Sequence, residues 1–181
     1  MLRKPVWEGR IAIKLDIKKA FDTPDWGFLY KVHECFGFNN TFIGCISTLF
    51  GSAHVSVLVN GSPKGYFSFS RVVRQRDPLS ALIFSIDEDY LSSLISHMVS
   101  QGQLKPMQDS KSLLTPTHQL YADDIIFFLK GRKKNIRVPK KVLNNYEGSY
   151  GQFICWDKSC IHFGKGFSIC RKHWITLELG I

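Results

Sequence analysis

The chain has no apolar run near the roughly 20 residues that span a bilayer, so the sequence does not predict a membrane protein. It shows no secretory leader, and its five cysteines are an odd number, which argues against a framework of paired disulfides. These absences predict free thiols in a reducing, intracellular compartment, either nuclear or cytoplasmic. Neither an internal repeat nor a low-complexity tract interrupts the 181 residues, which suffice for one domain with a sizeable core.

Acidic residues are scarce in one part of the chain. Residues 130–172 contain eleven Lys or Arg and only two acids, and the formal net charge of the whole chain is +9. A basic face concentrated in this way is the footprint expected for a phosphate backbone. The residues predicted to contact nucleic acid are Arg132, Lys133, Lys134, Lys140 and Lys141. A solvated helix face remains the alternative interpretation.

Cysteine and histidine residues near the C-terminus raise the possibility of a zinc site. The residues concerned are Cys155, Cys160, His162, Cys170 and His173. Their spacing matches no compact zinc finger, and Cys155 and His162 lie in runs that predict strands.

Two adjacent carboxylates, Asp123 and Asp124, stand between two apolar runs. Residues 120–122 and 125–129 each predict a buried strand, so the acidic pair is expected in the turn between them. Two like charges in one turn repel each other, and a divalent cation relieves that repulsion. Magnesium prefers carboxylate oxygens and usually takes one or two of them together with substrate phosphates. An ordinary solvated hairpin tip is the alternative.

A third acid, Asp16, ends a stretch in which Ile11, Ile13 and Leu15 alternate with less apolar residues. Alternation with a period of two predicts a half-buried strand. If that strand end lies beside the hairpin tip, the acids can hold two metal ions about 3.5–4 Å apart, the arrangement that assists in-line phosphoryl displacement. The alternative is a plain strand-end acid that enters a turn.

Four motifs in a fixed order carry a family resemblance. They are Asp16 followed by Ala20-Phe21-Asp22, Arg74-Gln75-Arg76-Asp77-Pro78-Leu79-Ser80, Tyr121-Ala122-Asp123-Asp124, and Lys158-Ser159. In this order and spacing the chain resembles the palm of a reverse transcriptase, over roughly residues 8–165. The greatest resemblance is to the LINE-type, non-LTR retrotransposon enzymes of plants.

The resemblance implies an RNA-directed DNA polymerase that uses RNA template, DNA primer and deoxynucleoside triphosphates. It implies that Asp16 and Asp123 hold two magnesium ions and that Asp124 is a third, less directly engaged acid. Lys158 stands where family members place a lysine proposed to protonate the leaving pyrophosphate. The residues that the resemblance places at the nucleotide are Phe21, beneath the sugar, and Arg74, Gln75, Pro78 and Ser80, along the groove. Without the resemblance, Phe21 is an ordinary core residue and Lys158 a surface lysine.

Departures from the family pattern predict a degraded palm, and the short lengths of chain before Ile11 and after Gly164, ten and seventeen residues, predict a fragment without fingers and thumb. Arg76 stands where the family has glycine, in a loop that approaches the substrate, and Val72 replaces another usual glycine. Glycine allows close backbone approach without steric cost. The alternative function is therefore a catalytically inactive remnant that at most binds nucleic acid weakly.

The hydrophobic pattern predicts an α+β fold in which helices pack on one face of a small antiparallel sheet. Besides the strands already named, the chain predicts a hairpin with strands over residues 54–60 and 66–70 and a turn at 60–65. Helices are predicted over residues 29–36, 42–50, 78–98 and 133–150, with Pro139 obscuring the start of the last one.

Overall fold

The computed structural model describes residues 9–20, 22–69, 71, 78–107 and 116–181. Two compact units divide the chain: one contains the described residues up to Ala20 together with those from Glu88 onward, and the other contains the described residues between them. Helix α3 (Pro78–Ser100) contributes its first part to the second unit and its remainder to the first. Within the described ranges, none of the helices combines the length and hydrophobicity needed to traverse a bilayer.

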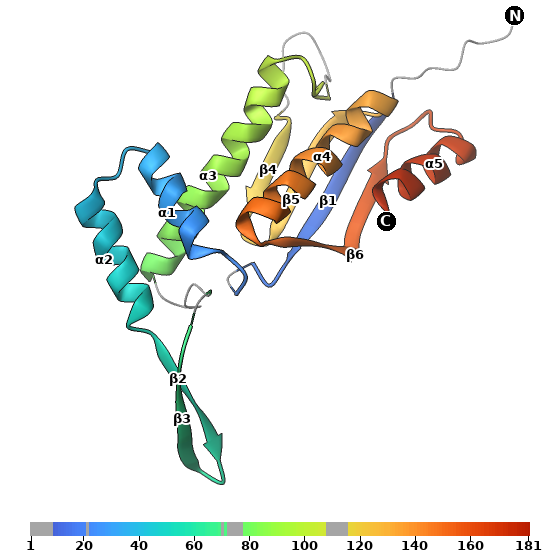
Figure 1. The fold of residues 1–181 in the computed structure, drawn as a ribbon. Coiled ribbons are helices and arrows are strands. Elements are labelled where there is room, and N and C mark those ends of the chain that lie inside the picture. The colour runs from blue at the N-terminus through green and yellow to red at the C-terminus, as the bar shows by residue number, and fades with distance from the viewer. Residues whose placement is uncertain (1–8, 21, 70, 72–77, 108–115) are drawn as a thin grey trace, which may run out of the picture. The chain divides into compact units, whose positions relative to one another are not determined.

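The first unit is built on a four-stranded antiparallel sheet with the strand order β4-β5-β1-β6 (Figure 1). Its strands are β1 (Arg10–Lys18), β4 (His118–Tyr121), β5 (Asp124–Lys130) and β6 (Phe153–Phe163). Strands β4 and β5 form a hairpin, and β1 lies between β5 and β6 although it comes first in the chain. The predicted antiparallel sheet is confirmed.

The alternation in β1 and β5 separates a buried face of the sheet from an open one. Side chains at odd positions of β1, from Ile11 to Ile17, are almost completely buried, whereas Ala12, Lys14 and Asp16 are partly exposed. Strand β5 repeats the pattern with buried Ile125, Phe127 and Leu129. Successive side chains of a strand point to opposite faces, so these odd-numbered residues form one continuous apolar layer.

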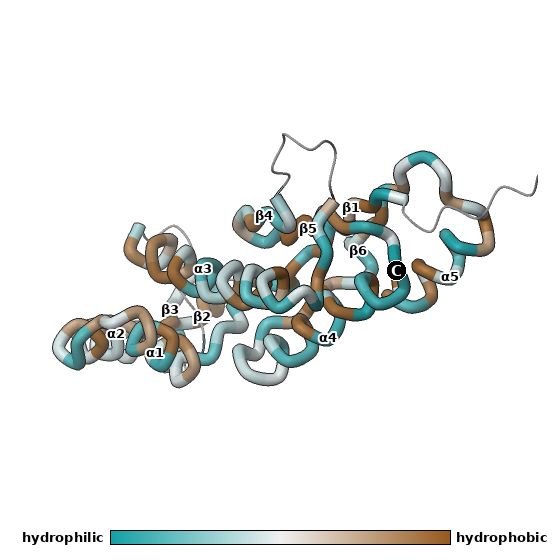
Figure 2. Tube along the Cα trace, turned by 90° about the horizontal axis from the view of Figure 1, so that it is seen from above, coloured by the Kyte–Doolittle hydropathy of each residue, from teal (hydrophilic) through white to brown (hydrophobic). Residues whose placement is uncertain are grey.

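Helices cover that apolar layer. Viewed from above, α4 (Lys133–Tyr150) and the part of α3 that belongs to this unit lie on the same side of the sheet (Figure 2). The buried residues of α4 include Ile136, Leu143 and Tyr150, and this helix contacts β5 and β6. Helix α5 (Ile169–Leu179) packs against α4. The prediction that helices lie on one face of the sheet is therefore confirmed.

Helix α4 has its predicted bounds and contains Pro139 in its interior. Proline has no N–H, so the backbone carbonyl of Asn135 lacks its usual helical donor. The side chain of Asn135 is buried and donates from Nδ2 to the carbonyls of Lys105, at 2.8 Å, and Lys130, at 2.7 Å. Its Oδ1 accepts from the backbone N–H of Lys105 at 2.6 Å. This amide therefore ties the first turn of α4 to the end of β5 and to the segment after α3.

Besides the first part of α3, the described residues of the second unit form two helices and an isolated hairpin. The helices are α1 (Trp26–Cys35) and α2 (Asn40–Gly51), and the hairpin strands are β2 (His54–Val59) and β3 (Ser62–Ser68). Both helices begin earlier than predicted because side chains cap them: Asp25 accepts from the N–H of Phe28 at 3.0 Å, and Asn39 accepts from that of Phe42 at 2.9 Å. Such N-caps satisfy backbone donors that have no partner within the helix.

The β2–β3 hairpin turns at Asn60-Gly61, with φ values of 49° and 77°. Positive φ at both central residues is the requirement of a type I′ turn, which Asn-Gly meets readily. The predicted turn over residues 60–65 was therefore too long. Ser62 to Gly65 belong to β3, whose pairing with β2 shifts register once between Val55 and Val57.

Candidate active site

The three predicted catalytic acids lie together at one end of β1 and β5, the two central strands of the four-stranded sheet. The β1–β5 register places Asp16 directly opposite Asp124, and the N–H of Ile17 donates to the backbone carbonyl of Asp123 at 2.7 Å. Residues directly opposite each other in an antiparallel pair have Cβ atoms about 4.5–5.5 Å apart. Asp16 thus lies beside two acids that follow it by more than a hundred residues in the sequence.

The turn that carries the acids differs from the prediction by one position. Tyr121 pairs with Asp124, so the turn consists of Ala122 and Asp123, and Asp124 is the first residue of β5. Ala122 adopts the left-handed conformation, with φ of 51°. A non-glycine residue there is strained by roughly 1–2 kcal/mol, and such strain is often found at functional sites.

Two of the acids project from the open face of the sheet. Asp16 alternates with buried Leu15 and Ile17, and Asp124 precedes buried Ile125, so their side chains point away from the helices. Both are partly exposed, and Asp123 in the turn is exposed. Carboxylates in this position are accessible to ions and to a substrate from the open face.

Lys14 is a site residue that the sequence analysis missed. Its Nζ lies 2.8 Å from Oδ2 of Asp124, and the side chains are 41% and 27% exposed, respectively. The hydrogen bond to Asp124 raises the pKa of Lys14 above its ordinary value, against a smaller lowering by burial. The signal was present in the sequence, since Lys14 stands two residues before Asp16 and a strand places such residues on the same face.

Strand β6 borders Asp16 through a large bulge. Lys14 pairs with Cys160 and Asp16 with Cys155, so the residues of β6 between these two cysteines bulge out opposite Leu15. The buried Ser159 closes the bulge: its Oγ accepts from the N–H of Asp16 at 3.3 Å and donates to the carbonyl of Cys155 at 2.9 Å.

The bulge contains Lys158, the predicted proton donor, whose side chain is exposed. This lysine precedes Ser159, whose hydroxyl contacts the Asp16 backbone, and its role as proton donor stays a prediction. Bulges frequently redirect side chains beside active sites.

The carboxylates suit magnesium in chemistry and in number. Across the described parts of the chain, no three His, Cys, Asp or Glu side chains converge as a ready metal-binding group. Asp124 is already paired with Lys14, which leaves Asp16 and Asp123 as the available carboxylates. Two carboxylates fit the usual magnesium site, where substrate phosphates and water complete the coordination shell.

The predicted nucleotide-binding residues fall into two groups. Phe21, Arg74 and Gln75 lie outside the described residues, as does Arg76. Pro78 is the first residue of α3, where a missing N–H costs nothing, and Ser80 is 2% exposed in the first turn of this helix. Their contribution to a nucleotide site stays a prediction.

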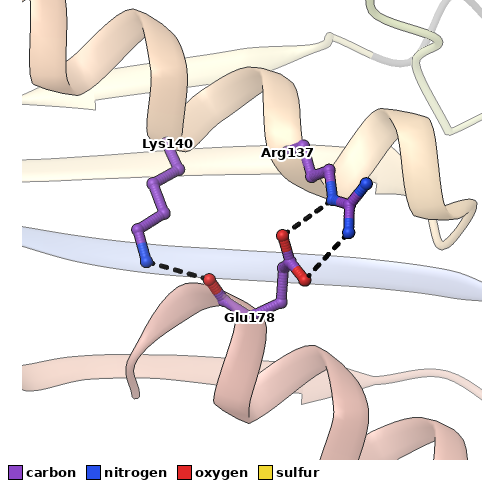
Figure 3. A network of polar contacts seen from close by, with 3 residues as sticks. All are labelled: Arg137, Lys140 and Glu178. Atoms are coloured by element: carbon purple, nitrogen blue, oxygen red, sulfur yellow. Dashed lines mark hydrogen bonds and ion pairs between the residues drawn. The ribbon is translucent and has the colours of Figure 1, made fainter.

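Three of the cations on α4 face α5. Arg137 forms a two-pronged ion pair with Glu178, and the ammonium of Lys140 donates to the Glu178 carbonyl at 2.9 Å (Figure 3). The ammonium of Lys133 lies 5.2 Å from the ring centre of Trp174. These side chains hold the C-terminal helix against α4 and are only partly available to a phosphate backbone.

The other predicted nucleic-acid contacts, Arg132, Lys134 and Lys141, are exposed. Lys134 and Lys141 are seven residues apart and therefore share one side of the helix. Because α4 covers the apolar layer of the sheet, whereas Asp16 and Asp124 point from the open face, this cationic side and the acids belong to separate surfaces of the first unit.

Comparisons with known proteins agree with this arrangement. Residues 3–170 match the family model described as reverse transcriptase (RNA-dependent DNA polymerase). An uncharacterised 149 kDa protein of transposon TX1 from Xenopus laevis is 32% identical over 63% of this chain and 8% of its own length. A retrovirus-related Pol polyprotein from the type-1 retrotransposable element R2 of Popillia japonica is 25% identical over 72% of this chain and 20% of its own.

Solved structures support the fold. The telomerase of Candida tropicalis, solved in complex with a fragment of telomeric RNA, superposes with a TM-score of 0.62 at 19% identity. The match covers 89% of this chain and 27% of the telomerase chain, so this chain spans only a minor part of it and of the two retrotransposon relatives above. The family model matches residues 3–170, most of the chain, and the acids lie together at one end of the central strands of a palm-type sheet, so this chain belongs to the reverse transcriptase family.

Proposed function

We propose that this chain provides the catalytic palm of an RNA-directed DNA polymerase from a LINE-type retrotransposon of plant origin. In the proposed reaction, the 3′-hydroxyl of a DNA primer attacks the α-phosphate of a deoxynucleoside triphosphate, a new phosphodiester bond forms and pyrophosphate leaves. The observation that carries the proposal is the β1–β5 register, which sets Asp16 opposite Asp124 and next to Asp123. Family membership supports the same reaction.

In this proposal Asp16 and Asp123 would hold two magnesium ions. Bound there, such ions activate an attacking hydroxyl and stabilise the leaving oxygen in nucleotidyl transfer. Lys158, in the β6 bulge beside Asp16, would donate a proton to the pyrophosphate. Ser159 would keep the Asp16 backbone in place through its two hydrogen bonds.

The open face of the sheet is the proposed side for primer and template. It carries the partly exposed Asp16 and Asp124, and its edge at the β4–β5 turn is solvent-exposed. The matching family model, described as an RNA-dependent DNA polymerase, supports an RNA template for this chain.

A primer-extension assay tests the proposal and separates it from the inactive-remnant alternative. The chain would be incubated with an RNA template, a labelled DNA primer, deoxynucleoside triphosphates and Mg²⁺ or Mn²⁺, in parallel with Arg76→Gly and Asp123→Asn variants. We expect little extension by the unaltered chain, because Arg76 adds bulk and charge where the family has glycine, and more by Arg76→Gly.

The Asp123→Asn change, combined with Arg76→Gly, should abolish that extension. Product that is independent of Asp123 would contradict the proposed site. No product from either the unaltered chain or Arg76→Gly, in a chain that still binds cations through its acids, would favour the remnant.

The basic side of α4 gives a second prediction, which concerns nucleic-acid binding. If Lys134 and Lys141 contact phosphates, single-stranded nucleic acid should bind more weakly as salt rises. Replacing both by alanine should then flatten the slope of log affinity against log salt by about 1.4, at roughly 0.7 per phosphate. Fluorescence anisotropy of a labelled oligonucleotide at several salt concentrations measures the slope.

The matched control replaces Lys31 and Lys64, two lysines of the second unit, and removes the same total charge. An equal slope in the Lys134/Lys141 variant and the unaltered chain would mean that these lysines serve only as a solubilising surface.

A further inference from the structure

The ion pair between Lys14 and Asp124 lies on the open face of the sheet, near the end of β1 and β5 that carries the acids. Lys14 pairs across the sheet with Ile126, and Asp124 lies two positions before Ile126, so the pair bridges β1 and β5 diagonally. On the opposite side, Lys14 pairs with Cys160 of β6. Asp16 is the other charged group beside it, two residues along the same face of β1.

An ordinary surface ion pair contributes little to stability, because both charges stay well solvated. This pair differs in its neighbours: Asp124 is directly opposite Asp16, and Asp123 precedes it. Three carboxylates at one end of the central strands repel one another. The ammonium of Lys14, 2.8 Å from Oδ2 of Asp124, neutralises one of them. An oxygen of Asp124 that accepts from an ammonium is a poor ligand for a second cation.

We propose that Lys14 keeps Asp124 out of the cation site, so that divalent ions at this end of the sheet bind Asp16 and Asp123 alone. The inference rests on the proposed function, since it concerns the same ions. Lys14 thereby acts as a positioning residue: its charge sets the number of carboxylates available and the net charge that a metal ion meets.

Mn²⁺ binding, measured as the loss of free-ion signal in electron paramagnetic resonance, tests the proposal. Each substitution below changes the charge beside the cation site by a known amount. Lys14→Met leaves Asp124 unpaired and adds one negative charge, so Mn²⁺ should bind between about threefold and tenfold more tightly. Asp124→Asn leaves the ammonium uncompensated, and binding should weaken by a similar factor. In the Lys14→Met/Asp124→Asn double variant both charges are gone, and the affinity should return to that of the unaltered chain.

The Mn²⁺ affinity of the double variant shows whether Asp124 is a ligand. If Asp124 were itself a ligand, the double variant would lose a ligand together with the ammonium and would bind Mn²⁺ clearly more weakly than the unaltered chain; that result would overturn the proposal. Lys14→Arg preserves the charge and should leave the affinity unchanged. The matched control is Lys165→Met, an exposed lysine just beyond the far end of β6, which removes the same charge at a distance from the acids.

The same measurements test the cation site and the role of Lys14 separately. If Asp16→Asn and Asp123→Asn lower the affinity for Mn²⁺ but the Lys14 variants do not behave as described, the cation site stands and the role of Lys14 is wrong. If neither acid affects Mn²⁺ binding, the proposed function loses its metal site and the inference falls with it.

Discussion

Asn135→Asp is expected to lower the free energy of unfolding by about 3 kcal/mol or more, because it places a carboxylate among groups that need donors. The Asn135 side chain is 2% exposed, and its Nδ2 donates to the carbonyls of Lys105 and Lys130. Aspartate has nearly the same shape, yet it has no N–H to offer and brings a buried negative charge against two carbonyl oxygens. Urea denaturation at neutral pH, followed by circular dichroism, measures the loss.

The chain contains a matched control for this substitution. Asn144 lies on the same helix and is exposed, so Asn144→Asp makes the identical chemical change in solvent and should alter stability by no more than about 0.5 kcal/mol. Similar stabilities for the two variants would show that the Asn135 amide does not hold α4 to the end of β5.

The sheet and its helical cover followed from the sequence because their residues repeat with a clear period. The alternation from Ile11 to Ile17 defined β1 and its buried face, and α4 was predicted with its bounds in spite of Pro139. The proline was tolerated inside the helix, and no local pattern foretold that the preceding turn is anchored to the rest of the unit through the side chain of Asn135.

Turns were harder to predict, because one residue decides them. The acidic pair was expected to form its turn, but pairing between Tyr121 and Asp124 moved the positive φ to Ala122. In the β2–β3 hairpin, Asn60-Gly61 alone makes the turn, since a type I′ turn needs only two residues. Proline and lysine after this turn suggested a longer loop than the chain forms.

Lys14, which the sequence analysis missed, and Ser159, which it named only as part of a motif, owe their roles to strand register. Lys14 meets Asp124 only because β1 and β5 pair antiparallel in this register, and Ser159 reaches the Asp16 backbone only because β6 bulges there. Likewise, the number of basic residues in and near α4 does not predict which groups their side chains contact. Lys133 and Lys140 turn toward Trp174 and Glu178 of α5, which a charge count cannot reveal.

The most direct test of the central claim, that Asp16 and Asp123 form one cation site, is Mn²⁺ binding to the purified chain by electron paramagnetic resonance. Asp16→Asn and Asp123→Asn should each weaken binding by about tenfold or more, because each removes one of two carboxylate ligands. Asp89→Asn removes an exposed carboxylate from helix α3 and should leave the affinity unchanged. If both site variants bind Mn²⁺ as tightly as the unaltered chain does, the acids do not form a cation site and the account is contradicted.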